Sequence, residues 1–149
     1  MSLPRGIRNN NPLNIRRTDK DQWKGMAEKQ TDPTFCQFTS MEWGWRAAFC
    51  LLIRTYYSKY QLSTIRAIVS RWAPATENNT PEYIANVSHL SGIGPDEPLG
   101  DPSKVPSHWQ LLAAAMAIQE NGRHDLDLIA LLRGWELCLN ASFHFPTIT

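Results

Sequence analysis

The chain has 149 residues, with 15 Lys+Arg against 14 Asp+Glu and a formal net charge of +1. This length is enough to bury a substantial core, and we expect residues 1–149 to form one domain. The near-neutral charge argues against a nucleic-acid partner, because such binding needs a basic face. No apolar run reaches the ~18–20 residues that span a bilayer, so we do not expect membrane insertion.

The N-terminal residues and the cysteines indicate the compartment of synthesis. The first residues contain no apolar segment of the signal-peptide type, so we expect synthesis in the cytoplasm. Cys36, Cys50 and Cys138 have no metal-ligand spacing and are expected to be reduced, buried thiols. Neither a histidine pair at helical spacing nor a phosphate-binding glycine loop is present, so we expect no metal and no cofactor. We also expect a monomer.

The N-terminal part of the chain, about 38 residues, is polar and rich in turn signals. The densest of these signals is Asn9–Pro12, which contains three consecutive asparagines. Trp23, Phe35 and Phe38 interrupt the polar pattern, but the apolar spacing is too short to distinguish a strand from a loop. We expect a small polar lobe that contains either a short β-hairpin or an ordered loop.

Two helices are predicted directly after this lobe. Thr39 and Glu42 have the spacing of a capping box, and the residues behind them repeat an apolar face every three or four positions as far as Tyr56. Ser63 is placed to cap the second helix, which must stop near Pro74 because proline disrupts a helix interior.

A third helix and a long loop follow. Thr80 before Pro81 predicts a helix start, and Gly92 is suited to the left-handed residue that ends the helix. The stretch 91–106 is so rich in glycine and proline that it is predicted to be a loop.

The next helix, 109–120, is predicted to be the centre of the fold. It is apolar on nearly every face, Ser107 is placed to cap it, and Gly122 is placed to end it. A last helix is predicted over 126–139. The expected fold is therefore mainly α, with about five helices around one central apolar helix beside the N-terminal polar lobe.

Glu120, at the end of this central helix, is the strongest candidate for a catalytic residue. Burial disfavours the charged form of a carboxyl, and the negative end of the helix dipole repels it, so we expect a raised pKa for Glu120. A carboxyl that stays protonated near neutral pH is suited to general acid catalysis. The alternative is a solvated residue at a frayed helix end, where water screens the dipole.

Several short motifs occur in one order along most of the chain. They are Arg5–Ile15, Trp23 with Gly25, Asp32 with Phe35 and Phe38, Ser40 with Glu42, Gly44, Arg46 and Ala47, Arg71–Pro74, Glu77–Thr80 with Tyr83 and Ile84, and Ile118 with Glu120, Asn121 and Gly122. This ordered set resembles phage- and prophage-encoded lysozyme-like proteins, in which Leu13 is more often Gly. In the similar glucosaminidases and lytic transglycosylases the helix that ends in the catalytic Glu precedes the Asn-rich segment. The chain therefore resembles a circularly permuted lysozyme-like domain of the α+β type.

The resemblance implies cleavage of peptidoglycan glycan strands with Glu120 as the general acid, as in bacterial cell-wall degradation. A muramidase or glucosaminidase of the ordinary type needs a second carboxylate. The candidates are Asp32, Glu42, Glu77 and Asp96. A lytic transglycosylase needs no second carboxylate, because a hydroxyl of the muramic sugar attacks and one Glu acts first as acid and then as base. The one-carboxylate mechanism is the one we favour.

The expected partner is the peptidoglycan glycan strand, with amide and aromatic side chains binding the sugars. The candidate binding residues are Asn10, Asn11, Asn14, Trp72, Glu77 and Tyr83. Hydrogen bonding within a turn is the alternative role of the asparagines, and core packing that of Trp72. Without an export signal, the protein would reach the wall after cell lysis or through a virion or secretion machine. The alternative function is a phage-derived structural module that binds glycan without cleaving it.

Overall fold

The computed structural model describes the backbone of residues 3–148 and the side chains of residues 3–140. This part of the chain is mainly helical, as predicted. Its helices are α1 (Arg5–Arg8), α2 (Met41–Cys50), the π-helix η1 (Leu51–Lys59), α3 (Ile65–Trp72), α4 (Thr80–Ser91), α5 (Pro106–Asn121) and α6 (Leu128–Ile148). Among the residues described, no helix is both long enough and apolar enough to cross a membrane.

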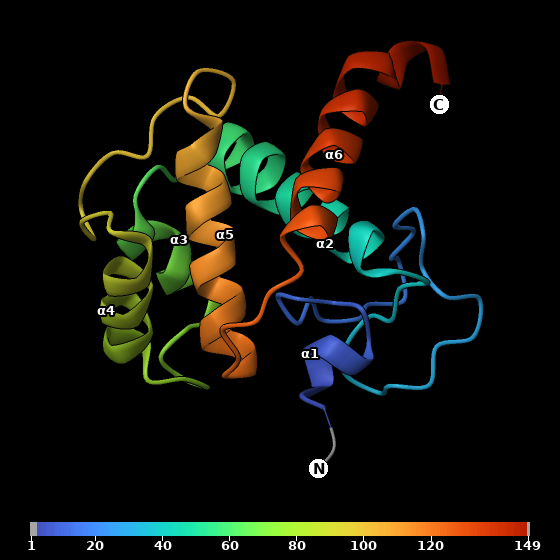
Figure 1. The fold of residues 1–149 in the computed structure, drawn as a ribbon, viewed down its shortest axis with the longest axis horizontal. Helices are drawn as coiled ribbons and strands as arrows, with labels where there is room; N and C mark the ends of the chain where they lie inside the picture. The colour runs from blue at the N-terminus through green and yellow to red at the C-terminus, as the bar shows by residue number, and fades with distance from the viewer. Residues whose placement is uncertain (1–2, 149) are drawn as a thin grey trace.

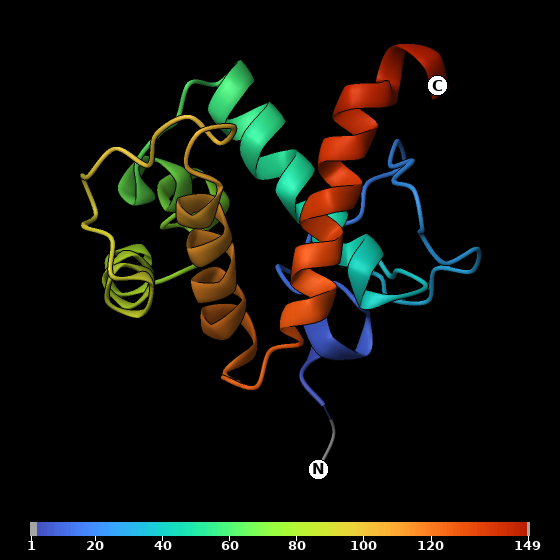
Figure 2. The same cartoon turned by 45° about the horizontal axis from the view of Figure 1, so that its top comes forward.

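The helices form two groups with α5 between them (Figures 1 and 2). On one side α3 packs against α4, and α4 packs against α5. On the other side α2 continues into η1 and crosses α6, with which it makes the most extensive helix–helix contact in the structure. The N-terminal lobe lies at the end of α2 that is farther from α3 and α4, and α1 reaches back to contact α5.

The core is centred on α5 and α2 together, which differs from the single central helix we predicted. Trp109 and Met116 of α5 are fully buried, but Leu111 on the same helix is 46% exposed. In α2 the buried Trp45 stacks on Phe49 with a distance of 5.7 Å between the ring centroids. Phe49 also meets Trp135 of α6 edge-on, with 5.0 Å between the ring centroids, so the aromatic side chains of α2 form part of the core beside α5.

The first two helix starts differ from those predicted. The capping box of Thr39 and Glu42 does not form, since α2 begins after Ser40 and no side chain caps it. The residue that caps α3 is Thr64 and not the predicted Ser63. The Thr64 hydroxyl accepts a hydrogen bond from the backbone N–H of Ala67 at 3.1 Å. Adjacent serine and threonine residues have the same capping chemistry, so the local sequence does not distinguish them.

The starts of α4 and α5 also differ from those predicted. Asn79, not Thr80, caps α4, because the Thr80 hydroxyl instead donates to the backbone carbonyl of Ala73. The helix α5 begins at Pro106 in place of the predicted 109 start, and Ser107 does not cap it. Proline in the first turn suits this position because its missing N–H would have no partner there.

The predicted helix ends are confirmed. Gly92 and Gly122 follow α4 and α5 with positive φ values of 74° and 67°. Glycine adopts this left-handed conformation without the strain that a Cβ would cause. The loop between α4 and α5 is also confirmed, whereas the last helix begins at Leu128 and extends to Ile148.

The N-terminal lobe is an ordered loop and not a β-hairpin. Within the described residues its only β-type pairings are the isolated bridges Arg16–Phe35 and Met26–Phe38. Asp32 holds much of this loop together, because its carboxylate accepts two hydrogen bonds of 2.8 Å from the Arg5 guanidinium.

Asp32 also accepts hydrogen bonds from the Asn9 amide and from the backbone N–H groups of Thr34 and Phe35. The Arg5 guanidinium and these donors hold the pKa of the Asp32 carboxyl well below its usual range. Side chains thus satisfy backbone groups that a strand ladder would otherwise pair.

The three cysteines are buried and free, as predicted. The sulfur atoms of Cys50 on α2 and Cys138 on α6 lie 3.1 Å apart, in the contact between these two helices.

Candidate active site

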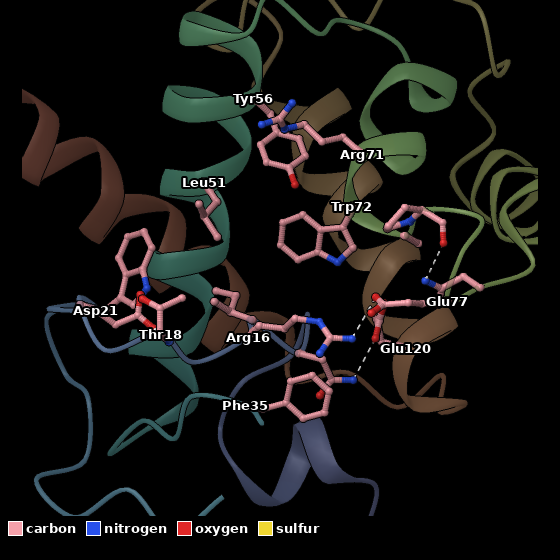
Figure 3. Close-up of a pocket in the computed structure, with 16 residues that line it drawn as sticks. Arg16, Thr18, Asp21, Phe35, Leu51, Tyr56, Arg71, Trp72, Glu77 and Glu120 are labelled. Atoms are coloured by element: carbon pink, nitrogen blue, oxygen red, sulfur yellow. Dashed lines mark hydrogen bonds and ion pairs between the residues drawn. The ribbon is translucent and has the colours of Figure 1, made fainter. Parts of the chain in front are cut away.

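A pocket of about 620 Å³ lies between the N-terminal lobe, η1, the end of α3 and the end of α5 (Figure 3). This volume is in the range of pockets that bind small molecules. The lining residues are Asn14, Ile15, Arg16, Thr18, Asp21, Trp23, Phe35, Leu51, Tyr56, Arg71, Trp72, Ala73, Pro74, Glu77, Asn78 and Glu120. Aromatic rings, arginines and carboxylates therefore face one another across the pocket.

Glu120 is part of the pocket wall, and its carboxyl group is held by two hydrogen-bond donors. The Asn14 side-chain amide donates to Oε1 at 2.9 Å, and the Tyr83 hydroxyl donates to Oε2 at 2.8 Å. Burial raises the pKa of Glu120, while these two hydrogen bonds and the positive charge of Arg16 act in the opposite direction. The structure therefore supports the buried carboxyl of the sequence analysis and not the frayed, solvated alternative.

Asn14 reaches Glu120 because the Asn-rich segment is fastened to the end of α5. The side-chain amide of Asn121, the residue after Glu120, donates to the carbonyl of Pro12 at 2.9 Å and to that of Ala117 at 3.0 Å. Asn14 itself has a φ of 52°, a left-handed conformation that asparagine adopts more readily than most residues. The loop thus turns sharply and presents the Asn14 amide to the carboxyl.

Tyr83 is a buried residue that donates a hydrogen bond to Glu120. It comes from α4, is only 4% exposed and does not line the pocket itself. Burial, together with the charge of Glu120, raises the pKa of Tyr83 well above its ordinary value. The phenol therefore keeps its proton, and in this structure it donates a hydrogen bond to Glu120.

Of the four second carboxylates proposed from the sequence, only Glu77 lines the pocket. It lies at the same end of the pocket as Glu120, and the Arg16 guanidinium reaches it with an N–O distance of 3.2 Å (Figure 3). Asp32 is bound by Arg5, Asp96 pairs with Arg66, and Glu42 is in the first turn of α2. The Glu77–Arg16 pair is exposed, so it contributes little to stability.

The structure does not bring Asn10 and Asn11 to the pocket. Asn10 donates its amide to the carbonyl of Phe38 at 3.0 Å. Asn11 is fully buried and donates to the carbonyls of Ile15 and Cys36. Both amides satisfy backbone carbonyls of the lobe, which is the structural alternative considered for them.

Trp72 lies both against the core and in the pocket wall. Its ring packs against the core and lies 5.6 Å from that of Tyr56, yet it also lines the pocket. Tyr56 and Arg71 line the pocket but were not among the predicted site residues. Tyr56 belongs to the apolar face of a predicted helix, and Arg71 entered only through the Arg71–Pro74 motif. Arg71 directly precedes Trp72 at the end of α3, so that motif placed it beside a predicted binding residue.

A scan of the sequence against protein-family models finds no match. Protein P5 of Pseudoalteromonas phage PM2 is 38% identical to the chain over 134 residues, which cover 89% of this chain and 80% of that protein. Among the described side chains, no group of three His, Cys, Asp or Glu residues could hold a metal ion.

Proposed function

The chain belongs to the family of Protein P5 of phage PM2, and we propose that it cleaves the glycan strands of peptidoglycan with Glu120 as the general acid. The observation that carries this proposal is the Glu120 carboxyl, partly buried in a pocket wall with a raised pKa and two fixed hydrogen-bond donors. A relative from a bacteriophage also fits an enzyme that opens a bacterial wall. The kinship with circularly permuted lysozyme-like domains is part of the same proposal.

The surroundings of Glu120 suit both states of a general acid. Before the reaction, burial favours the protonated carboxyl, which can give its proton to the oxygen of the glycosidic bond. After proton transfer, the donors Asn14 and Tyr83 stabilise the carboxylate that has formed. The same carboxylate can then take up a proton from the attacking hydroxyl.

We favour the one-carboxylate mechanism of a lytic transglycosylase. Glu77 lies at the same end of the pocket as Glu120, but the Arg16 guanidinium already binds its carboxylate at 3.2 Å. In the favoured mechanism the hydroxyl on C6 of the muramic sugar attacks C1, the bond from C1 to the leaving oxygen breaks, and an anhydro sugar is the product.

A glycan-binding module without catalysis is the second candidate, and the aromatic lining of the pocket favours it. Trp23, Phe35, Tyr56 and Trp72 all contribute to the wall. Such rings stack on the apolar faces of sugars whether or not a bond is cleaved.

Incubation of the protein with purified, insoluble peptidoglycan distinguishes the two candidates. We expect soluble fragments to be released, and mass spectrometry to show anhydro ends that lack the water added by hydrolysis. Fragments with hydrolysed ends would keep the cleavage proposal but contradict the one-carboxylate mechanism. Binding to the pellet without any release would favour the glycan-binding module, and neither binding nor release would contradict both.

Tyr83→Phe is expected to shift the pH dependence of cleavage. The substitution removes a hydrogen bond that stabilises the Glu120 carboxylate, so the pKa of Glu120 rises further. A general acid loses activity as the pH rises through its pKa, so the alkaline limb of the pH–rate profile moves to higher pH. We also expect kcat at the optimum to fall about tenfold, which corresponds to ~1.4 kcal/mol.

Tyr57→Phe is the matched control, since Tyr57 packs on Trp109 and does not line the pocket. Its pH profile should match that of the wild type. An alkaline limb in Tyr83→Phe that coincides with the wild-type limb would show that Tyr83 does not tune Glu120.

A further inference from the structure

Arg71 is the pocket-lining cation that has no acidic partner among the described side chains. The pocket contains two arginines, Arg16 and Arg71. Arg16 pairs with Glu77, whereas the ion pairs of the described residues include none for Arg71. An arginine in a ligand-sized pocket with no carboxylate of its own is available to an anionic group of the ligand.

Aromatic rings hold the Arg71 guanidinium in place. Its central carbon lies 3.8 Å from the ring centroid of Tyr60 and 5.9 Å from that of Tyr56. Stacking on a ring face leaves the N–H groups along the guanidinium edge free to donate. Two parallel N–H donors of this kind match the two oxygens of a carboxylate.

The position of Arg71 indicates which part of a ligand it would meet. Arg71 and Tyr56 lie at one end of the pocket, Glu120 and Glu77 lie at the other, and Trp72 lies between them (Figure 3). A glycan with its scissile bond at Glu120 and a sugar ring on Trp72 would bring a substituent of that sugar to Arg71.

We propose that Arg71 forms an anion subsite that binds a carboxylate on the glycan, so that the pocket selects acidic, muramic-acid-containing strands over neutral ones. This inference rests on the proposed function and names the substrate class of the same site. Muramic sugars have a lactyl group, which ends in a carboxylate or continues into a peptide with carboxylates of its own. Chitin has the same β-1,4 backbone and N-acetyl groups but no carboxylate, so it lacks the group that Arg71 would bind.

Isothermal titration with three soluble ligands tests the subsite. The ligands are a tetrasaccharide of alternating N-acetylglucosamine and N-acetylmuramic acid, the same tetrasaccharide with stem peptides, and neutral chitotetraose. All titrations use the Glu120→Gln background, so that no ligand is cleaved. Arg71→Gln should weaken binding of a carboxylate-bearing ligand about tenfold. It should change the affinity for chitotetraose by less than about twofold.

Two further variants sharpen the test. Arg133→Gln removes an exposed arginine of α6 outside the pocket and should bind all three ligands as the background protein does. Arg71→Lys retains the charge without the planar fork, so its loss should lie between those of Arg71→Gln and the control. A loss confined to the peptide-free ligand identifies the lactyl carboxylate as the bound group, and a loss confined to the peptide ligand identifies the stem carboxylates.

The outcomes separate this inference from the proposed function. If wild-type protein cleaves peptidoglycan but Arg71→Gln binds every ligand as Arg133→Gln does, the subsite is wrong and the function stands. An equal loss for all three ligands, chitotetraose included, would also overturn the subsite, because it would indicate a structural role. If binding shows the expected selectivity but the wild type releases no fragments, the subsite stands and cleavage fails.

Discussion

Glu120→Gln is expected to lower the rate of glycan-strand cleavage by about 10²–10⁴-fold, the usual contribution of a general acid. Glutamine has the shape of glutamic acid, but its amide cannot supply the proton. The pocket should remain intact, because the Asn14 amide can rotate and the Tyr83 hydroxyl can act as an acceptor. The measurement is the release of soluble fragments from purified peptidoglycan.

The matched control is Glu136→Gln, which removes an exposed carboxyl of α6 that does not line the pocket. It should cleave at the wild-type rate. Equal rates for Glu120→Gln and the wild type would remove Glu120 from the mechanism.

Glu120→Gln should also be more stable than the wild type near neutral pH. Because burial raises the pKa of Glu120 in the folded state, folding favours the protonated carboxyl. That stabilisation is fully present below the pKa of the unfolded chain and is lost as the pH rises through the folded-state pKa. At about pH 7, which is above the pKa of the carboxyl in the unfolded chain, the buried Glu120 therefore lowers the free energy of unfolding of the wild type. Glutamine does not titrate, so the variant avoids this loss.

Thermal melts at two pH values test this expectation. Glu120→Gln should have a higher Tm than the wild type at about pH 7, and the difference should shrink towards about pH 3. Glu136→Gln should show no such difference. A Tm below that of the wild type at both pH values would contradict the expectation that the buried Glu120 carboxyl costs stability near neutral pH.

Gly44→Ala is expected to destabilise the folded protein by about 3 kcal/mol, at the upper end of the usual effect of overpacking. A Cβ at Gly44 in α2 would lie 1.9 Å from the carbonyl oxygen of Asn10 and 2.9 Å from the ring of Pro12. The obstacle is mainly backbone, so no side-chain rotation relieves it. The Asn-rich segment would have to move away from α2, and Asn14 in the same segment would move away from Glu120.

Urea unfolding measures the loss of stability, and Gly94→Ala is the control. A Cβ at Gly94 would meet only the Glu97 side chain, at 3.5 Å, and the position needs no positive φ. We expect a change of less than about 0.5 kcal/mol for this control. If Gly44→Ala were as stable as Gly94→Ala, the close packing of the Asn-rich segment on α2 would be wrong.

The sequence alone determined the features that depend on local backbone geometry. Gly92 and Gly122 end their helices as predicted, because a left-handed residue after a helix favours glycine whatever lies nearby. The position of Glu120 was also recognised from the local sequence, because a helix that is apolar on nearly every face is expected to be buried. The helix starts were less predictable, because Thr80 could either cap α4 or bond to Ala73, and the tertiary structure uses it for the latter.

Only the tertiary structure decided which side chains form the pocket. Asn10, Asn11 and Asn14 have the same chemistry, but only Asn14 meets Glu120, a residue 106 positions away in the chain. Whether Arg71 is paired or free depends likewise on which acidic groups the fold brings near it. Hydrogen-bonding capacity belongs to the residue type, whereas the choice of partner depends on how distant segments pack, and packing is a property of the whole core.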